Sequence, residues 1–207
     1  MDRFVLCTGN TGKITEIKEL MPSSVTVLSL PDVGLGPELL ETGDTLTDNA
    51  LQKARFVHLH TGLPCLADDS GLEVDALGGA PGVHSARYAG DGKDASANMD
   101  ELLRNLGPRM DRTARFRTVL AWVHGGGEDT FEGTVEGRIL LSRRGAGGFG
   151  YDPIFVPNGF ERTFAEMDLK EKNAISHRAR AMRQWIAHVR PMMSEGADHD
   201  QASDDRA

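Results

Sequence analysis

The chain has 207 residues, and its 23 lysines and arginines against 31 aspartates and glutamates give a formal net charge of −8. This length predicts one domain, and the acidic balance argues against general binding to nucleic acids or anionic membranes. No apolar run reaches the roughly 18 residues that a membrane span needs, and two cysteines are too few for a disulfide scaffold. The first residues lack the layout of a signal peptide, so we expect a cytoplasmic protein.

The first third of the chain alternates between strand and helix patterns. The spacing of apolar residues and the positions of glycine and proline predict these elements in chain order: a strand at 4–7, a glycine-rich loop at 8–12, a helix that Pro22 ends, a strand at 25–30, a helix from Asp44 or Thr45 to about His60, and a short strand at 65–67 that ends at Asp68.

The rest of the chain predicts one more helix, a hairpin and a final helix. In chain order the elements are a long irregular loop at 77–92, a helix from Asp94 or Ser96 to Gly107, a strand at 114–124 with an antiparallel partner at 130–139, a strand at 154–156, and a helix from about Glu171 to Val189. Residues 194–207 are polar and acidic without periodicity, so they predict a disordered tail after a folded domain at 1–193. Early strand–helix alternation with a late hairpin predicts an α/β protein with a mixed sheet.

The segment TGNTGK at 8–13 follows a strand and opens a helix. Backbone N–H groups at a helix N-terminus attract anions, and Lys13 adds a positive charge. This is not a Walker A loop, which would need glycine at position 7 and serine or threonine at 14, where the chain has Cys7 and Ile14. The segment favours an anion site, and a solvated glycine turn is the alternative.

Two adjacent carboxylates, Asp68 and Asp69, come at the end of a predicted strand. Such a pair repels unless water or a cation lies between the charges, and Mg²⁺ selects oxygen ligands. Ligands of open α/β sheets gather at the carboxyl ends of strands, so the pair predicts a metal or general-base site, with an acidic surface turn as the alternative. Glu41, from another loop, is a possible third carboxylate.

Two further segments carry groups that suit a nucleotide. The glycine-rich stretch at 147–153 contains Phe149 and Tyr151, and an aromatic ring there offers a stacking surface for a base. At the start of the final helix, Arg178 lies about 60° from the centre of the apolar stripe and His177 lies on the far side. A charge that close to a buried stripe needs a partner or a ligand, unless it reaches solvent along the helix surface. Together the four segments predict a nucleotide phosphate site that uses a metal.

In this order, the motifs resemble those of the inosine triphosphate pyrophosphatase family, which hydrolyses non-standard purine nucleoside triphosphates (ITP, dITP and XTP). The resemblance runs from about Phe4 to Val189. It rests on the segments 8–13 with Glu16, 41–43 with 49–50 and 53–54, 67–72, 78–82, 85–88, 148–154 and 176–178.

The resemblance implies an elongated mixed sheet flanked by helices, with two lobes and a nucleotide groove between them, usually in a homodimer. It implies that Glu41 and Asp69 bind Mg²⁺ and that Asp69 accepts the proton of the attacking water, in a catalytic set with Asp68 and Lys13. The implied substrate-binding residues are Thr8, Gly9, Asn10, Thr11, Gly12, Lys13, Lys53, Ser70, Phe149, Gly150, Tyr151, Asp152, Lys172, His177 and Arg178. Within that set, the triphosphate would be held by 8–13 and Lys53, the purine would stack on Phe149, and its 6-oxo edge would be read by Lys172, His177 and Arg178.

The reaction implied is hydrolysis between the α- and β-phosphates of a free purine nucleotide, which releases a monophosphate and pyrophosphate. No nucleic-acid or membrane partner is expected. Two alternatives stay open: a Maf-like pyrophosphatase acting on modified pyrimidine nucleotides, and a non-catalytic nucleotide-binding module. The joint presence of Lys13, Glu41, Lys53, Asp68 and Asp69 speaks against the second alternative.

Overall fold

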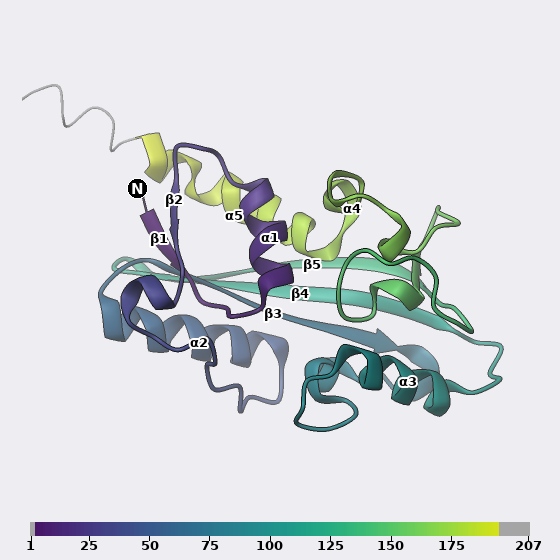
Figure 1. Ribbon diagram of the computed structural model, residues 1–207. Helices are drawn as coiled ribbons and strands as arrows, with labels where there is room; N and C mark the ends of the chain where they lie inside the picture. The colour runs from purple at the N-terminus through teal and green to yellow at the C-terminus, as the bar shows by residue number, and fades with distance from the viewer. Residues whose placement is uncertain (1–2, 195–207) are drawn as a thin grey trace, which may run out of the picture.

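The computed structural model describes residues 3–194, which form a mixed six-stranded sheet with helices around it (Figure 1). The strands are β1 (Arg3–Leu6), β2 (Thr26–Leu28), β3 (Cys65–Val74), β4 (Thr113–His124), β5 (Gly127–Ile139) and β6 (Phe155–Pro157). The helices are α1 (Thr11–Leu20), α2 (Leu46–Thr61), α3 (Ala95–Leu106), α4 (Leu169–Ile175) and α5 (His177–Ser194), and short 3₁₀ turns lie at Pro31–Val33, Asp75–Leu77, Gly82–Arg87, Asp152–Ile154 and Phe164–Glu166.

The sheet has the order β2-β1-β3-β4-β5-β6, in which β1 is parallel to β2 and β3 and the other neighbours are antiparallel. The predicted α/β class with a mixed sheet is therefore confirmed. The division of residues 1–193 into two lobes stays a prediction, and the predicted disordered tail lies outside the described residues except for Ser194, which ends α5. Within residues 3–194, no helix has the length and apolar character that crossing a membrane requires.

Alternating side chains of the central strands build a core on each face of the sheet. On one face, Cys65 and Ala67 of β3 pack with Val57 of α2. On the other, Leu66 of β3 packs with residues of α1 and α5, including Trp185. Figure 1 shows α2 on one side of the sheet and α1 with α5 on the other.

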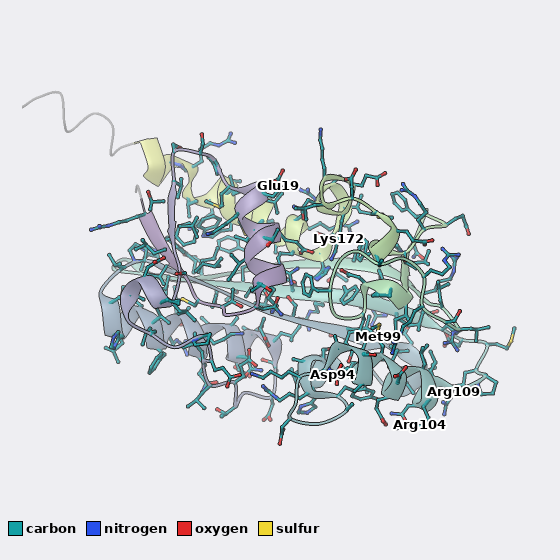
Figure 2. All side chains as sticks on the ribbon, in the orientation of Figure 1. Glu19, Asp94, Met99, Arg104, Arg109 and Lys172 are labelled. Carbon is teal, nitrogen blue, oxygen red and sulfur yellow. The ribbon has the colours of Figure 1, made fainter. Side chains whose placement is uncertain are left out.

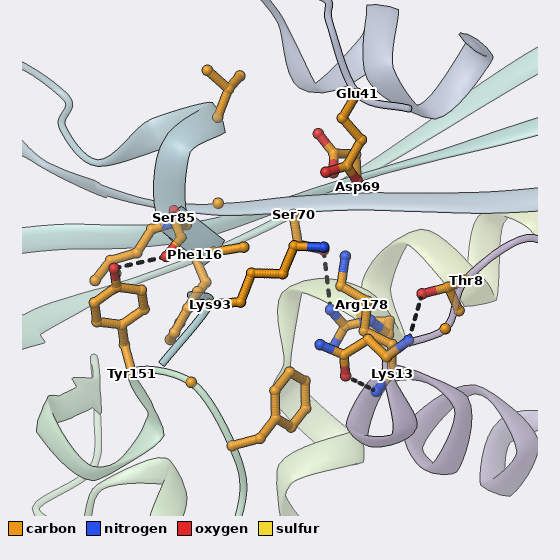
Figure 3. Close-up of a pocket in the computed structure, with 18 of the residues that line it drawn as sticks. Thr8, Lys13, Glu41, Asp69, Ser70, Ser85, Lys93, Phe116, Tyr151 and Arg178 are labelled. Carbon is orange, nitrogen blue, oxygen red and sulfur yellow. Dashed lines mark hydrogen bonds between the residues drawn. The ribbon is translucent and has the colours of Figure 1, made fainter. Parts of the chain in front are cut away.

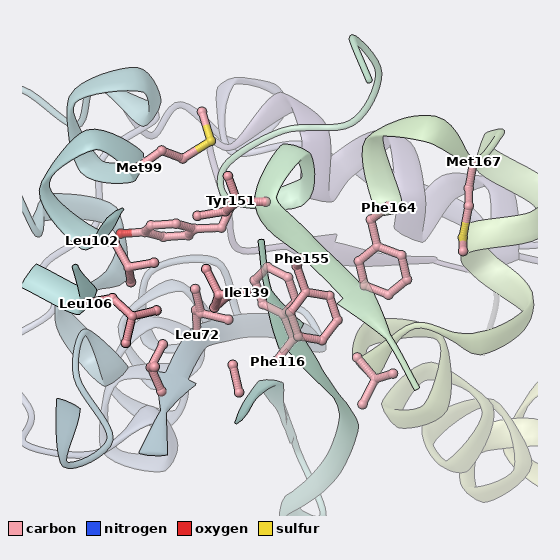
Figure 4. Packing of buried hydrophobic residues seen from close by; sticks show 14 residues of the cluster. Leu72, Met99, Leu102, Leu106, Phe116, Ile139, Tyr151, Phe155, Phe164 and Met167 are labelled. Carbon is pink, nitrogen blue, oxygen red and sulfur yellow. The ribbon is translucent and has the colours of Figure 1, made fainter. Parts of the chain in front are cut away.

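A third core lies at the far end of the long strands, where α3 covers β3 through its apolar stripe (Figure 4). Met99, Leu102 and Leu106 of α3 belong to this cluster together with Leu72 of β3. Figure 2 shows that Arg104 points from α3 into solvent, and 71 % of its side chain is exposed. The stripe spacing that predicted the helix thus also predicted its buried face.

Polar side chains cap the starts of α1 and α2, and Thr45 is one of the two residues predicted to cap α2. Asn10 accepts a hydrogen bond from the backbone N–H of Lys13, and Thr45 accepts one from that of Asp48, which caps α1 and α2. Gly62 ends α2 in the left-handed conformation, at φ 68°. These caps fix the two helices whose lysines reach the site described below.

The predicted elements differ most from the structure at two places. The strand at 65–67 does not end at Asp68: β3 continues to Val74, because the Asp68–Gly71 stretch pairs in register with β4, with Asp68 opposite Leu120. The final helix is also two helices, since Ser176 takes an extended conformation at ψ 157° and ends α4. In addition, the predicted irregular loop at 77–92 contains the 3₁₀ turn Gly82–Arg87.

Candidate active site

The site forms where β1 ends beside the longer strand β3. Leu6 and Leu66 are the last paired residues of the two strands, after which β3 continues to Val74 and the chain after β1 turns away toward α1. A cavity of about 460 Å³ opens there (Figure 3). A site at the carboxyl end of a parallel strand was predicted, but the strand is β1 and not β3.

The cavity brings together most of the predicted site residues. Of that set the lining includes Thr8, Gly9, Asn10, Lys13, Glu41, Lys53, Asp69, Ser70, Phe149, Gly150, Tyr151, Asp152, Lys172, His177 and Arg178. Three predicted residues, Thr11, Gly12 and Asp68, are not part of the lining. Glu38, Lys93 and Phe116 also line it, although no motif in the sequence singles them out.

Asp68 and Asp69 point to opposite faces of the sheet, because successive side chains of a strand alternate. Asp68 lies on the face of α1 and α5, where it pairs with Lys13 and with Arg178. Asp69 lies on the face of α2, where its Oδ1 is 3.2 Å from Lys53 Nζ. The two carboxylates therefore do not form one adjacent pair, which corrects the expectation drawn from their place at a strand end.

Two lysines from opposite faces of the sheet meet at the backbone of β3. Lys53 Nζ, from α2, is 2.8 Å from the carbonyl oxygen of Asp68, and Lys13 Nζ, from α1, is 3.4 Å from the same oxygen. The Lys53 ammonium is buried and also donates to Glu41 Oε1 at 2.6 Å. The convergence concentrates positive charge where β1 has left the β3 edge free.

Glu41 and Asp69 share the Lys53 ammonium, and Figure 3 shows their side chains lying close together. Burial raises the pKa of Asp69, and the neighbouring Glu41 charge adds to the rise despite the opposing lysines. Burial acts in the same sense on Glu41, but Lys53, Lys13 and Arg87 outweigh it and hold the pKa of that carboxyl below its usual range. Asp69 is thus the more basic of the two carboxylates.

Arg178 is buried and all of its nitrogen atoms are used. Nε donates to Asp68 at 2.7 Å, Nη2 donates to Ser70 Oγ at 3.0 Å, and Nη1 pairs with Glu16. Burial opposes ionisation of Asp68, but Arg178 and Lys13 outweigh it and hold the pKa of Asp68 far below its usual range. The result is a buried array of fixed charges behind the cavity wall.

Glu16 joins this array to the last helices. Its second oxygen is 2.6 Å from Lys172 Nζ, and Lys172 also pairs with Asp152. Figure 2 shows Lys172 directed into the molecule. Glu16 belongs to the first motif, but the sequence predicts no binding or catalytic role for it. A glutamate on α1 looks like an ordinary surface residue until the burial of that helix face is known.

Phe149 lies against the start of α1. A Cβ atom on Gly12 would come within 2.4 Å of its ring, so glycine at position 12 is what lets the ring lie there. The ring is 4.8 Å from Lys172 Nζ and 5.7 Å from the Arg178 guanidinium, both in cation–π range. Asp152 accepts a hydrogen bond from the backbone N–H of Phe149 at 2.8 Å, which fixes the loop.

Tyr151, the other aromatic residue of this loop, serves the core. Its ring belongs to the cluster of Figure 4, and its hydroxyl donates to the carbonyl oxygen of Ser85 at 2.8 Å. Burial raises the pKa of this hydroxyl. Tyr151 therefore ties the loop to the 3₁₀ turn Gly82–Arg87, which also lines the cavity.

His177 is buried, contrary to its predicted place on the far side of the helix. The helix break at Ser176 makes His177 the first residue of α5, where the ring stacks on Phe116 with centroids 4.7 Å apart and planes 10° apart. Its Nδ1 atom makes no hydrogen bond with any residue in the range 3–194. Burial lowers the pKa of His177 well below its usual value, and the Arg178 and Lys172 charges lower it further. A neutral imidazole with unused hydrogen-bonding capacity thus lines the cavity.

We expect His177 to stay neutral across the pH range in which exposed histidines take up a proton, which centres on about 6.5. The unfolded chain would bind that proton, so this residue should make folding less favourable as pH falls below this range. NMR titration of the imidazole signals measures the protonation, with His177→Gln to assign the resonance. A midpoint for His177 near that of the exposed histidines would contradict the expectation.

The sequence and the fold match a known family. The Ham1 family model aligns with residues 4–188, which include the cavity lining and all of the sheet except Arg3. The chain belongs to the Ham1 family. Among its relatives, a dITP/XTP pyrophosphatase of Christiangramia forsetii is 51 % identical over 187 residues, which is 90 % of this chain and 98 % of that protein. A dITP/XTP pyrophosphatase of Porphyromonas gingivalis is 49 % identical, over 89 % of this chain and 95 % of its own.

A solved Ham1 structure has the same fold. The Ham1 protein of Staphylococcus aureus superposes with a TM-score of 0.84 at 36 % sequence identity, over 92 % of this chain and 100 % of that chain. The predicted resemblance is therefore confirmed at the level of the family and the fold.

Proposed function

We propose that this Ham1 protein is a Mg²⁺-dependent pyrophosphatase that hydrolyses ITP, dITP and XTP to the monophosphate and pyrophosphate. The observation that carries the proposal is the convergence of Lys13 and Lys53 with Glu41 and Asp69 at one wall of a cavity that also holds Phe149. The names of the relatives, dITP/XTP pyrophosphatases that align over nearly their full length, support the substrate class.

The carboxylates Glu41 and Asp69 fit Mg²⁺ as a pair. Protein sites for Mg²⁺ commonly supply one or two carboxylates and leave the other positions to substrate phosphates and water. Both carboxylates reach the same point, the Lys53 ammonium, and both line the cavity. The described residues contain no group of three or more metal-binding side chains, so a closed protein cage does not form there. Bound Mg²⁺ would supply charge that offsets the negative charge on the phosphates.

In this proposal, Asp69 accepts the proton of the attacking water. Burial and Glu41 raise its pKa, which favours proton uptake. Attack of the water oxygen on the α-phosphorus breaks the bond to the bridging oxygen, and pyrophosphate leaves with the electron pair. Lys13 and Lys53 lie where they can stabilise the charge of that leaving group.

The purine is best read by His177, with Arg178 in a supporting position. Each nitrogen atom of Arg178 already contacts Asp68, Glu16 or Ser70, whereas the neutral ring of His177 lines the cavity and stacks on Phe116. An imidazole N–H would donate to the 6-oxo oxygen of hypoxanthine or xanthine and would face the amino group of adenine, which is a mismatch. Guanine also has a 6-oxo group, so this contact does not reject GTP.

A substrate panel tests the proposed class. Pyrophosphate release from ITP, dITP and XTP should exceed release from ATP, dUTP and 5-methyl-UTP by orders of magnitude in kcat/KM. The last two substrates test the Maf-like alternative, and preferential turnover of 5-methyl-UTP would overturn the purine assignment.

A homodimer and a cytoplasmic location belong to the same proposal, since the family resemblance implies the first and the cysteine usage favours the second. Light scattering of the purified protein tests the dimer.

A further inference from the structure

Lys93 extends the cationic lining of the cavity from a second direction (Figure 3). It comes from the segment just before α3, far in sequence from α1 and α2. Its ammonium is 2.7 Å from Glu38 Oε1, and Glu38 also lines the cavity. The Lys93–Glu38 ion pair thus joins two loops that border the cavity, the one before α2 and the one before α3.

This ion pair differs from the other charge pairs of the lining in its exposure. The side chains of Lys53, Lys172 and Arg178 are 5 %, 4 % and 2 % exposed, and each is held by buried or half-buried carboxylates. The side chains of Lys93 and Glu38 are 44 % and 76 % exposed. Because water screens a pair of this kind, the contact contributes little to the stability of the protein. Lys93 can therefore exchange its partner for an anionic ligand at little cost.

Lys93 also has an unusual backbone conformation. Among the described residues other than glycine it is the one with a positive φ, at 51°. A left-handed lysine is disfavoured relative to glycine, and such conformations persist where the neighbouring structure imposes them. Here Asp94 follows directly and caps α3, accepting hydrogen bonds from the backbone N–H groups of Ser96 and Ala97. The cap fixes the turn that presents the Lys93 side chain to the cavity.

We propose that Lys93 is a further substrate-binding residue. Its ammonium gives up the ion pair with Glu38 and binds the phosphate chain of the nucleotide instead. Without ligand, Glu38 neutralises Lys93 and places a carboxylate at the cavity. When a triphosphate enters, its oxygens compete with Glu38 for the ammonium, and the charge-assisted hydrogen bond to phosphate replaces the screened ion pair. The inference rests on the proposed function, since it concerns the binding of the same substrate.

The test is steady-state hydrolysis of ITP, followed by pyrophosphate release, for the wild type and four variants. Lys93→Ala should raise KM by about tenfold and change kcat by less than about twofold, the result expected when one charge-assisted contact to bound substrate is lost. Lys93→Arg should stay near wild type because it keeps the charge. Glu38→Gln should lower KM, because it releases Lys93 for phosphate. Lys18→Ala removes an exposed lysine of α1 outside the lining and should leave both constants unchanged.

Opposite changes in KM for Lys93→Ala and Glu38→Gln are the signature of partner exchange. If both variants raise KM equally, the pair only fastens the two loops together, and the inference is wrong. It is also wrong if Lys93→Ala matches Lys18→Ala. An inactive wild-type protein would overturn the proposed function itself, whereas an active wild type with an unaffected Lys93→Ala overturns only the role of Lys93.

Discussion

Replacing Asp69 with asparagine is expected to lower kcat for ITP by about 100-fold to 10,000-fold, the range typical for loss of a general base. Asparagine keeps the shape of the side chain but cannot accept the proton of the attacking water. Stability should change little, because Lys53 keeps Glu41 and the carbonyl oxygen of Asp68 as partners. Pyrophosphate release measures the loss, and urea unfolding checks the fold.

The matched control for this variant is Asp100→Asn, which removes an exposed carboxylate of α3 that pairs with Arg143 outside the cavity. It should leave kcat and KM unchanged. If Asp69→Asn retains wild-type turnover, Asp69 is not the proton acceptor. If it loses activity by unfolding, the residue is structural.

Arg178→Ala should be the most destabilising change in the site. The variant would leave two buried carboxylates, Asp68 and Glu16, without the partner that they share at the start of α5. Removal of one member of a buried ion pair typically costs about 3–5 kcal/mol of unfolding free energy. Urea unfolding measures this loss, with Arg55→Ala as the control.

Arg55 pairs with Glu128 on the surface, and both side chains are more than two-fifths exposed. Its loss should cost less than about 1 kcal/mol. An Arg178→Ala variant as stable as Arg55→Ala would show that the buried array does not hold the site together. A stable variant that turned over ITP and ATP in an unchanged ratio would agree with a positioning role for Arg178 rather than base reading.

Local sequence patterns predicted the helices and strands. The errors in these predictions lie where contacts between distant segments decide where an element ends. Glycines, Pro22 and the capping residues predicted for α2 and α3 placed the ends of α1, α2 and α3 within one or two residues. The extent of β3 could not be predicted, because Asp68 and Asp69 are poor strand formers and only their register with β4 keeps them extended. The break at Ser176 was equally hidden, since neither glycine nor proline marks it.

The candidate residues were predictable as a set but not as an arrangement. Their segments were found because the motifs are local, whereas the split of Asp68 and Asp69 onto two faces depends on the strand. The burial of His177 depends on how α5 meets the sheet: a Cβ on Gly133 of β5 would lie 2.1 Å from the carbonyl oxygen of His177. Lys93 and Glu38 gave no signal, because exposed lysines and glutamates are common in any sequence.

The most direct test of the account is the fate of ITP incubated with the purified protein, with and without Mg²⁺. We expect equal amounts of IMP and pyrophosphate in the presence of Mg²⁺, no free orthophosphate, and little product when the metal is chelated. Release of orthophosphate, or tight binding of ITP without Mg²⁺-dependent pyrophosphate, would contradict the proposed pyrophosphatase.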